Sequence, residues 1–144
     1  MINRKPEKIM KLTSVQNLIP PTPKMQAVIS LVFVLLVLVT PGPVIEWLKA
    51  IMALPIRPPS ESEFPMDKVV HCMLFAVSGF LVCRAWQPTR GAMAIIAMML
   101  AFAALTEVLQ MVVPGRSGSV MDWLADGVGV VLGFWWAQRL AQKG

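Results

Sequence analysis

Four long apolar runs follow one another along the chain, and polar or proline-rich segments separate them. The runs cover residues 25–40, 69–86, 91–113 and 120–137. A helix rises about 1.5 Å per residue and a bilayer core is about 30 Å thick, so each run can cross or nearly cross a membrane. The pattern predicts an all-α membrane protein built as a bundle of four transmembrane helices over residues 25–137.

The segments around these runs complete the predicted organisation. Residues 1–24 read as a basic tail and residues 138–144 as a second, short tail. After the first run, VIEWLKAIMAL (44–54) mixes Glu46 and Lys49 with apolar residues, which is typical of a short helix in the membrane interface. The first run is short enough to be a signal peptide. The TPGPV that follows lacks a small-x-small cleavage site, so we expect an uncleaved spanning helix.

Composition supports a membrane protein and argues against nucleic-acid binding. Hydrophobic residues make up 56% of the 144 residues and charged residues 15%. The net charge of +5 arises largely from five basic residues before the first run, where membrane topology explains them. No basic face is interleaved with aromatic residues, so we expect no nucleic-acid partner.

Basic residues predict the orientation of the bundle. Four helices place both termini on one side, and the side richer in Lys and Arg is normally cytoplasmic. The terminal side carries Arg4, Lys5, Lys8, Lys11, Lys24, Arg84, Arg90, Arg139 and Lys143, whereas the other side carries Lys49, Arg57, Lys68 and Arg116. We expect a multi-pass protein of the inner (cytoplasmic) membrane with both termini in the cytoplasm. Segment 41–68 and the PGRSGS turn then face outward.

Every His and carboxylate within the last three runs lies toward this outward end, and the only charge in the inner part is Arg84 at its boundary. Glu107 and Asp126 both lie about 9 Å inside their helices, which is about two turns. His71, the single His, follows Asp67, the expected N-cap of the second helix. An ionisable group inside a membrane is costly and is therefore a candidate functional residue. We predict an outward-facing polar pocket of His71, Glu107 and Asp126, with Arg116 above it.

Several of these polar residues also have a structural interpretation. Ser119-x-x-Asp122 has the form of a capping box. Pro114-Gly115 suits the central positions of a type II turn, beyond which Arg116 can be solvated. Each residue taken singly is therefore as compatible with a structural role as with a functional one.

Small and amide side chains predict how the helices pack. Gly129-x-x-x-Gly133 allows close approach of a neighbouring helix, and such packing is also compatible with a homo-oligomer. Glu107 and Gln110, one turn apart, could tie helices together through hydrogen bonds.

The order of the polar residues carries a family resemblance. The pattern is Asp67-Lys68-x-x-His71, Glu107-x-x-Gln110, Pro114-Gly115-Arg116-Ser117 and Asp122-x-x-x-Asp126-x-x-Gly129. It resembles the VanZ-like family of small membrane proteins, named after a teicoplanin-resistance protein, over about residues 65–137. The resemblance implies an integral membrane domain, linked in some members to glycopeptide resistance and cell-envelope processes.

The resemblance also implies which polar positions of the family are matched in this chain, and we expect them to contribute to a ligand-binding site. The shared polar positions are Asp67, Lys68, His71, Glu107, Gln110, Arg116, Ser117 and Asp122. Asp126 departs from the family, in which Asn is more usual. An extra carboxylate beside other acidic groups must be neutralised by a proton, a cation or Arg116.

Three functions are compatible with these residues. In the first, Arg116 holds the phosphate or carboxylate of an anionic lipid or lipid-linked precursor, while His71 acts as acid/base with Glu107 as its partner. In the second, the bundle binds a lipid or scaffolds an envelope complex without catalysis. A small transporter is less favoured, because the inner half contains no carboxylate or His. The sequence has no activated nucleophile and no metal-ligand spacing such as H-E-x-x-H, so it predicts no metal or cofactor and leaves catalysis open.

Overall fold

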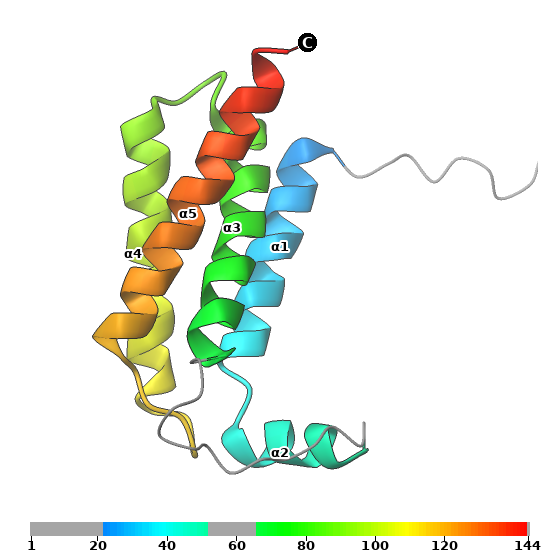
Figure 1. The fold of residues 1–144 in the computed structure, drawn as a ribbon, viewed down its shortest axis with the longest axis vertical. Helices are drawn as coiled ribbons and strands as arrows, with labels where there is room; N and C mark the ends of the chain where they lie inside the picture. The colour runs from blue at the N-terminus through cyan, green and yellow to red at the C-terminus, as the bar shows by residue number, and fades with distance from the viewer. Residues whose placement is uncertain (1–21, 52–65, 144) are drawn as a thin grey trace, which may run out of the picture.

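The computed structural model describes residues 22–51 and 66–143, and the regular elements within them are α-helices (Figure 1). The elements are α1 (Pro23–Leu38), α2 (Gly42–Ile51), α3 (Met66–Trp86), α4 (Ala92–Gln110) and α5 (Val120–Ala141). Most of the predicted basic tail, Arg57 and the end of the 44–54 segment lie outside the described residues.

Three of these helices, α3, α4 and α5, are each long and apolar enough to cross a membrane. Helix α1 and the start of α2 meet the same criterion only as a bent pair, which gives up to four spans. The predicted all-α membrane fold is therefore confirmed. The chain is a multi-pass membrane protein.

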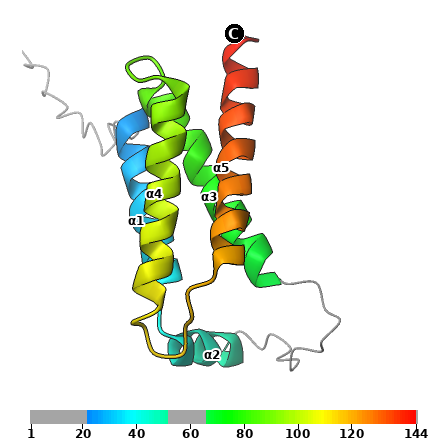
Figure 2. The same cartoon turned by 90° about the vertical axis from the view of Figure 1, so that its left-hand side faces the viewer.

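Helix α2 turns away from the bundle and runs across one end of it (Figures 1 and 2). The chain bends by 95° between Pro23–Leu38 and Gly42–Leu48. Pro41 lies in the connection between the two helices and Pro43 in the first turn of α2; neither can donate the backbone hydrogen bond that would continue α1. We call this end of the molecule the α2 end. The described chain begins and finishes at the opposite end.

Helices α3 and α5 pack more closely than the other helix pairs of the described residues, and glycines on α5 make this close packing possible. A Cβ atom placed on Gly129 would collide with the carbonyl oxygen of Cys72, and one on Gly133 with that of Ala76. The backbones therefore approach more closely than any larger residue would allow. The prediction that Gly129-x-x-x-Gly133 is a packing surface is confirmed.

Apolar side chains divide between a dry core and a lipid-facing surface. The core lies between the four bundle helices and contains Val34, Leu38, Phe75, Val82, Ile95, Met99, Ala103 and Val130. Many large apolar side chains on all five helices point outward instead. In water such a surface would be unfavourable, whereas in a bilayer it faces acyl chains.

Helix ends differ from the sequence prediction at two places near the α2 end. Helix α3 already includes Met66, so Asp67 lies in its first turn and the predicted N-cap role of Asp67 is wrong. An acidic side chain in the first turn of a helix is stabilised by the helix dipole, which suits Asp67 at this position. Helix α4 ends at Gln110, so Glu107 lies in its last turn rather than two turns inside.

After α4 the backbone forms hydrogen bonds of the 3₁₀ type before it turns. The N–H groups of Val112 and Val113 donate to the carbonyls of Leu109 and Gln110, three residues earlier, in place of the α-helical spacing of four. Hydrogen bonding thus continues while the α-helix itself has ended. At the other end of the hairpin, α5 begins at Val120 as predicted and extends to Ala141, past the expected end at residue 137.

Candidate functional site

Three helices bring one buried ionisable residue each to a common point near the α2 end. These residues are His71 of α3, Glu107 of α4 and Asp126 of α5, with exposed fractions of 1%, 7% and 0%. The Nδ1 atom of His71 lies 3.1 Å from Oδ1 of Asp126 and 3.6 Å from Oε1 of Glu107. We call this trio the buried centre. The structure thus brings together the three residues that the sequence placed at similar depth.

The contacts within the buried centre are unequal. The 3.1 Å contact of His71 with Asp126 is a hydrogen bond, and the tautomer of the imidazole decides which group donates. The 3.6 Å separation from Glu107 is too long for one. Asp126, rather than Glu107, therefore orients the imidazole.

Two carboxylate oxygens of the buried centre have no hydrogen-bond partner within the described residues. They are Oε1 of Glu107 and Oδ2 of Asp126, and both are shielded from solvent. A buried acceptor without a partner loses its hydration and gains nothing in return, which costs about 1–3 kcal/mol, and more for a charged group. Each such atom in a folded protein therefore calls for an explanation.

The second oxygen of Glu107 holds the start of α5. Its Oε2 accepts a hydrogen bond of 2.6 Å from the backbone N–H of Ser119, while Oγ of Ser119 accepts one from the N–H of Met121. Ser119 is therefore the N-cap of α5, as predicted. The reciprocal carboxylate of the expected capping box comes from Glu107 of α4 and not from Asp122, so that part of the prediction is wrong.

Asp122 is instead committed to an ion pair with Lys68, which links α5 to α3. The Lys68 Nζ lies 2.7 Å from Oδ1 of Asp122, and the two side chains are 34% and 7% exposed. Asp67, next to Lys68, is exposed. The charge of the nearly buried Asp122 is thus compensated locally, which distinguishes it from the carboxylates of the buried centre.

Gln110 contributes to the fold one turn beyond Glu107. Its buried amide Nε2 donates a hydrogen bond of 3.1 Å to the backbone carbonyl of Leu38, in the last turn of α1. This bond satisfies a carbonyl that α1 leaves free at its end. Of the two residues expected to tie helices together, Gln110 joins α4 to α1 and Glu107 joins α4 to α5.

The turn between α4 and α5 has the predicted type II geometry. Gly115 has φ +73°, and the N–H of Arg116 donates to the carbonyl of Val113 across the turn. The N–H of Gly42 donates to the carbonyl of Pro114, so the turn is attached to the bend between α1 and α2. Arg116 is half-buried on this anchored turn. Ser117 follows it and is exposed.

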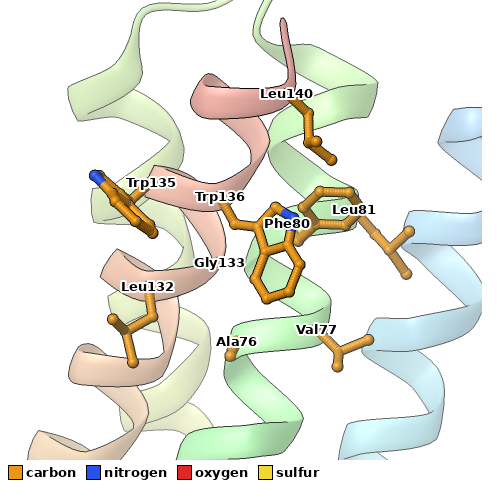
Figure 3. A pocket seen from close by; sticks show the side chains of 9 residues that line it. All are labelled: Ala76, Val77, Phe80, Leu81, Leu132, Gly133, Trp135, Trp136 and Leu140. Carbon is orange, nitrogen blue, oxygen red and sulfur yellow. The ribbon is translucent and has the colours of Figure 1, made fainter. Parts of the chain in front are cut away.

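An apolar hollow lies away from the buried centre. Its volume is about 820 Å³, and it lies between α3 and α5, toward the C-terminal end of α5 (Figure 3). Side chains such as Phe80, Trp136 and Leu140 line it. A much smaller hollow of about 180 Å³ lies between α4 and the start of α5, with Glu107 and Ser119 in its wall. Of the buried centre, only Glu107 lines that hollow.

Trp123 is a site neighbour that sequence reasoning missed. Its indole Nε1 donates a hydrogen bond of 3.2 Å to the carbonyl of Leu100, and its ring lines the small hollow beside Glu107. A Trp close to a helix start normally indicates an interfacial anchor, so its position alone carried no sign of this contact.

The fold and the buried centre together define a class: a multi-pass membrane protein with a His–carboxylate cluster between its helices. The chain matches the VanZ/LLP1 family over residues 7–141 and belongs to that family. The match covers α1 and α2 as well as the 65–137 segment that carried the resemblance in the sequence. No curated protein and no solved structure matches the chain.

Proposed function

We propose that this VanZ-family protein acts in the cell envelope by holding an anionic group of a membrane lipid or lipid-linked precursor at the α2 end. Arg116 carries this proposal. Its side chain is half-buried, and within the described residues no carboxylate forms an ion pair with it. A guanidinium binds phosphate or carboxylate through two parallel hydrogen bonds, which suits such a headgroup.

The anchored turn supports a binding role for Arg116. Its backbone conformation is set by the type II turn, and the turn is bonded to Gly42. A cation on a fixed turn loses less conformational entropy on binding than one on a mobile loop. Gly118, two residues after Arg116, is one of the residues that line the small hollow beside Glu107.

In the catalytic form of the proposal, His71 transfers a proton beneath the bound headgroup. Asp126 orients the imidazole through the 3.1 Å hydrogen bond, and Glu107, at 3.6 Å, becomes its partner only after a small movement. The α2 end faces outward in this proposal, with both termini in the cytoplasm. Because the family resemblance implies a link to teicoplanin resistance, the teicoplanin susceptibility of cells is the phenotype to measure.

A non-enzymatic lipid-binding or scaffolding protein is the second candidate. The observation that favours it is the structural use of the polar residues. Glu107 bonds the N–H of Ser119, and Lys68 pairs with Asp122, so both tie helices together. In that case the headgroup is recognised without being transformed.

Native mass spectrometry of protein purified from membranes tests the headgroup site. We expect a co-purifying anionic lipid in the wild type that Arg116→Ala loses. Arg90→Ala is the matched control, because Arg90 is exposed in the α3–α4 connection at the opposite end of the bundle. Equal lipid retention in both variants would refute the proposal.

Two measurements in cells complete the test. His71→Ala should abolish a teicoplanin phenotype while lipid binding persists if the protein is catalytic, and should leave the phenotype intact if it is a scaffold. For orientation, an impermeant maleimide should label Ser117→Cys in intact cells. A cysteine at exposed Gln142, at the other end, should react only after permeabilisation. The reverse labelling pattern would show that the α2 end is cytoplasmic.

A further inference from the structure

The geometry of the buried centre points to a metal site. We propose that His71, Glu107 and Asp126 bind a divalent transition metal ion, with Zn²⁺ as the best fit. Each residue offers one ligand atom, and these atoms all lie within 4.8 Å of one another. Imidazole nitrogen and carboxylate oxygen are both donor types that Zn²⁺ binds, and the imidazole favours a transition metal over Mg²⁺ or Ca²⁺.

The separations of the ligand atoms agree with this ion. In a tetrahedral site with bonds of about 2.0–2.1 Å, neighbouring ligand atoms lie about 3.3 Å apart. Nδ1 of His71 lies 3.1 Å from Oδ1 of Asp126 and 3.6 Å from Oε1 of Glu107. Both separations from His71 are therefore within a few tenths of an ångström of the tetrahedral value, and all three ligand atoms lie within 4.8 Å of one another.

The orphaned oxygens are the independent observation. Oε1 of Glu107 and Oδ2 of Asp126 are buried, and within the described residues they have no hydrogen-bond partner. Glu107 points Oε1 toward His71 even though Oε2 already has Ser119 as its donor. A metal ion would supply the missing partner to Oε1 of Glu107 directly, and it would engage Oδ2 of Asp126 where that carboxylate binds through both of its oxygens.

Charge favours the same conclusion. Two ionised carboxylates and a neutral imidazole carry a formal charge of about −2, which is costly inside a bilayer. A divalent ion brings the total to zero without any protonation. Lys68, on the same helix as His71, is already paired with Asp122.

A second, overlapping set of ligands is less suitable. Asp67, His71 and Asp122 also have ligand atoms within 4.8 Å of one another. Asp67 is exposed, however, and Asp122 is held by Lys68, whereas all three residues of the buried centre are buried. This contrast makes Asp67 a useful control position.

The protein supplies three ligands, which leaves one position of a tetrahedral ion for water or a ligand oxygen. Glu107 lines the small hollow between α4 and α5, which is the route by which a small molecule could approach. Binding through Nδ1 would occupy the His71 nitrogen that otherwise forms the hydrogen bond with Asp126. The inference does not rest on the headgroup site at Arg116.

Titration of the chelator-treated full chain in detergent with Zn²⁺ tests the proposal. We expect the wild type to bind one ion per chain, as measured by isothermal titration calorimetry and elemental analysis. A Co²⁺ titration should produce the visible absorption of a tetrahedral site. Asp126→Asn keeps the shape of the side chain and should weaken Zn²⁺ binding at least about tenfold. Asp67→Asn should bind as the wild type does.

Further variants keep the test decisive if Asp126→Asn does not fold. Glu107→Gln can still accept the hydrogen bond from Ser119 and should also weaken Zn²⁺ binding at least about tenfold. Arg116→Ala should bind Zn²⁺ normally, even if it loses lipid. A wild type that binds no Zn²⁺ would overturn the inference, and so would Asp126→Asn or Glu107→Gln binding as tightly as the wild type. Loss of binding in Asp67→Asn alone would also overturn it.

Discussion

Replacing Gly129 with alanine should weaken the packing of α5 against α3. A Cβ at this position would collide with the carbonyl oxygen of Cys72 and would lie 3.0 Å from the backbone N of Ala76. Both atoms belong to the backbone of α3, which cannot rotate away as a side chain would. The two helices must therefore move apart.

The expected magnitude follows from two opposing contributions. Overpacking a tight interface costs about 1–3 kcal/mol. Alanine is a better helix former than glycine by about 0.5–1 kcal/mol, which offsets part of this cost. We expect Gly129→Ala to lower the free energy of unfolding by about 1–2 kcal/mol. Asp126, one turn earlier on α5, should move away from His71 as the helices separate.

Gly127→Ala is the matched control on the same helix. Its Cβ would meet only the flexible Cδ2 atom of Leu100, at 3.3 Å. We therefore expect Gly127→Ala to be neutral or slightly stabilising. Unfolding of both variants in mixed detergent and SDS, followed by circular dichroism, measures the difference. If Gly129→Ala unfolds within about 0.5 kcal/mol of Gly127→Ala, the close-packing argument is refuted.

Three further substitutions test individual contacts, each by the same unfolding measurement. Lys68→Met should destabilise more than Asp122→Asn, because it leaves the nearly buried carboxylate of Asp122 without its cation; equal effects would contradict this. Glu107→Ala should be less stable than Glu107→Gln by about 1 kcal/mol, since the amide oxygen still accepts from Ser119, and identical stabilities would show that this bond contributes nothing. Gly115→Ala should cost about 1–2 kcal/mol because φ is +73°; an unchanged midpoint would mean that the turn can rearrange.

The polar residues near the α2 end show how far local pattern can predict contacts. Ser119 was recognisable as an N-cap, because capping depends on residues a few positions away in the chain. The carboxylate that bonds its backbone N–H comes from Glu107, twelve residues earlier on another helix. The capping-box spacing pointed to Asp122, which the tertiary structure pairs with Lys68 instead. The spacing of nearby residues does not show which carboxylate, near or distant along the chain, accepts the hydrogen bond from this N–H group.

The proposed metal site illustrates the same limit for residues that lie further apart in the chain. Metal motifs are recognisable in sequence when their ligands lie on one turn of a helix or in one loop. Here the three ligand atoms come from three helices, with His71 and Asp126 separated by 55 positions. Equal depth within the membrane suggested that they could meet, but depth does not specify which helix face they occupy. The sequence therefore predicted no metal, whereas the folded helices bring the three candidate ligand residues together.

The lengths of the hydrophobic runs by themselves determined that this is a membrane protein and where its helices lie. A backbone buried in lipid must satisfy its own hydrogen bonds, so each run long enough to cross the bilayer forms a helix. The glycine spacing of α5 and the Pro-Gly turn were equally readable, since both are local backbone requirements. Tertiary structure alone decided which partners the charged side chains take. Those partners depend on the rotation and crossing of neighbouring helices, which side-chain packing sets across the whole bundle. The family match agrees with the polar pattern, and the arrangement of His71, Glu107 and Asp126 exists only in the folded chain.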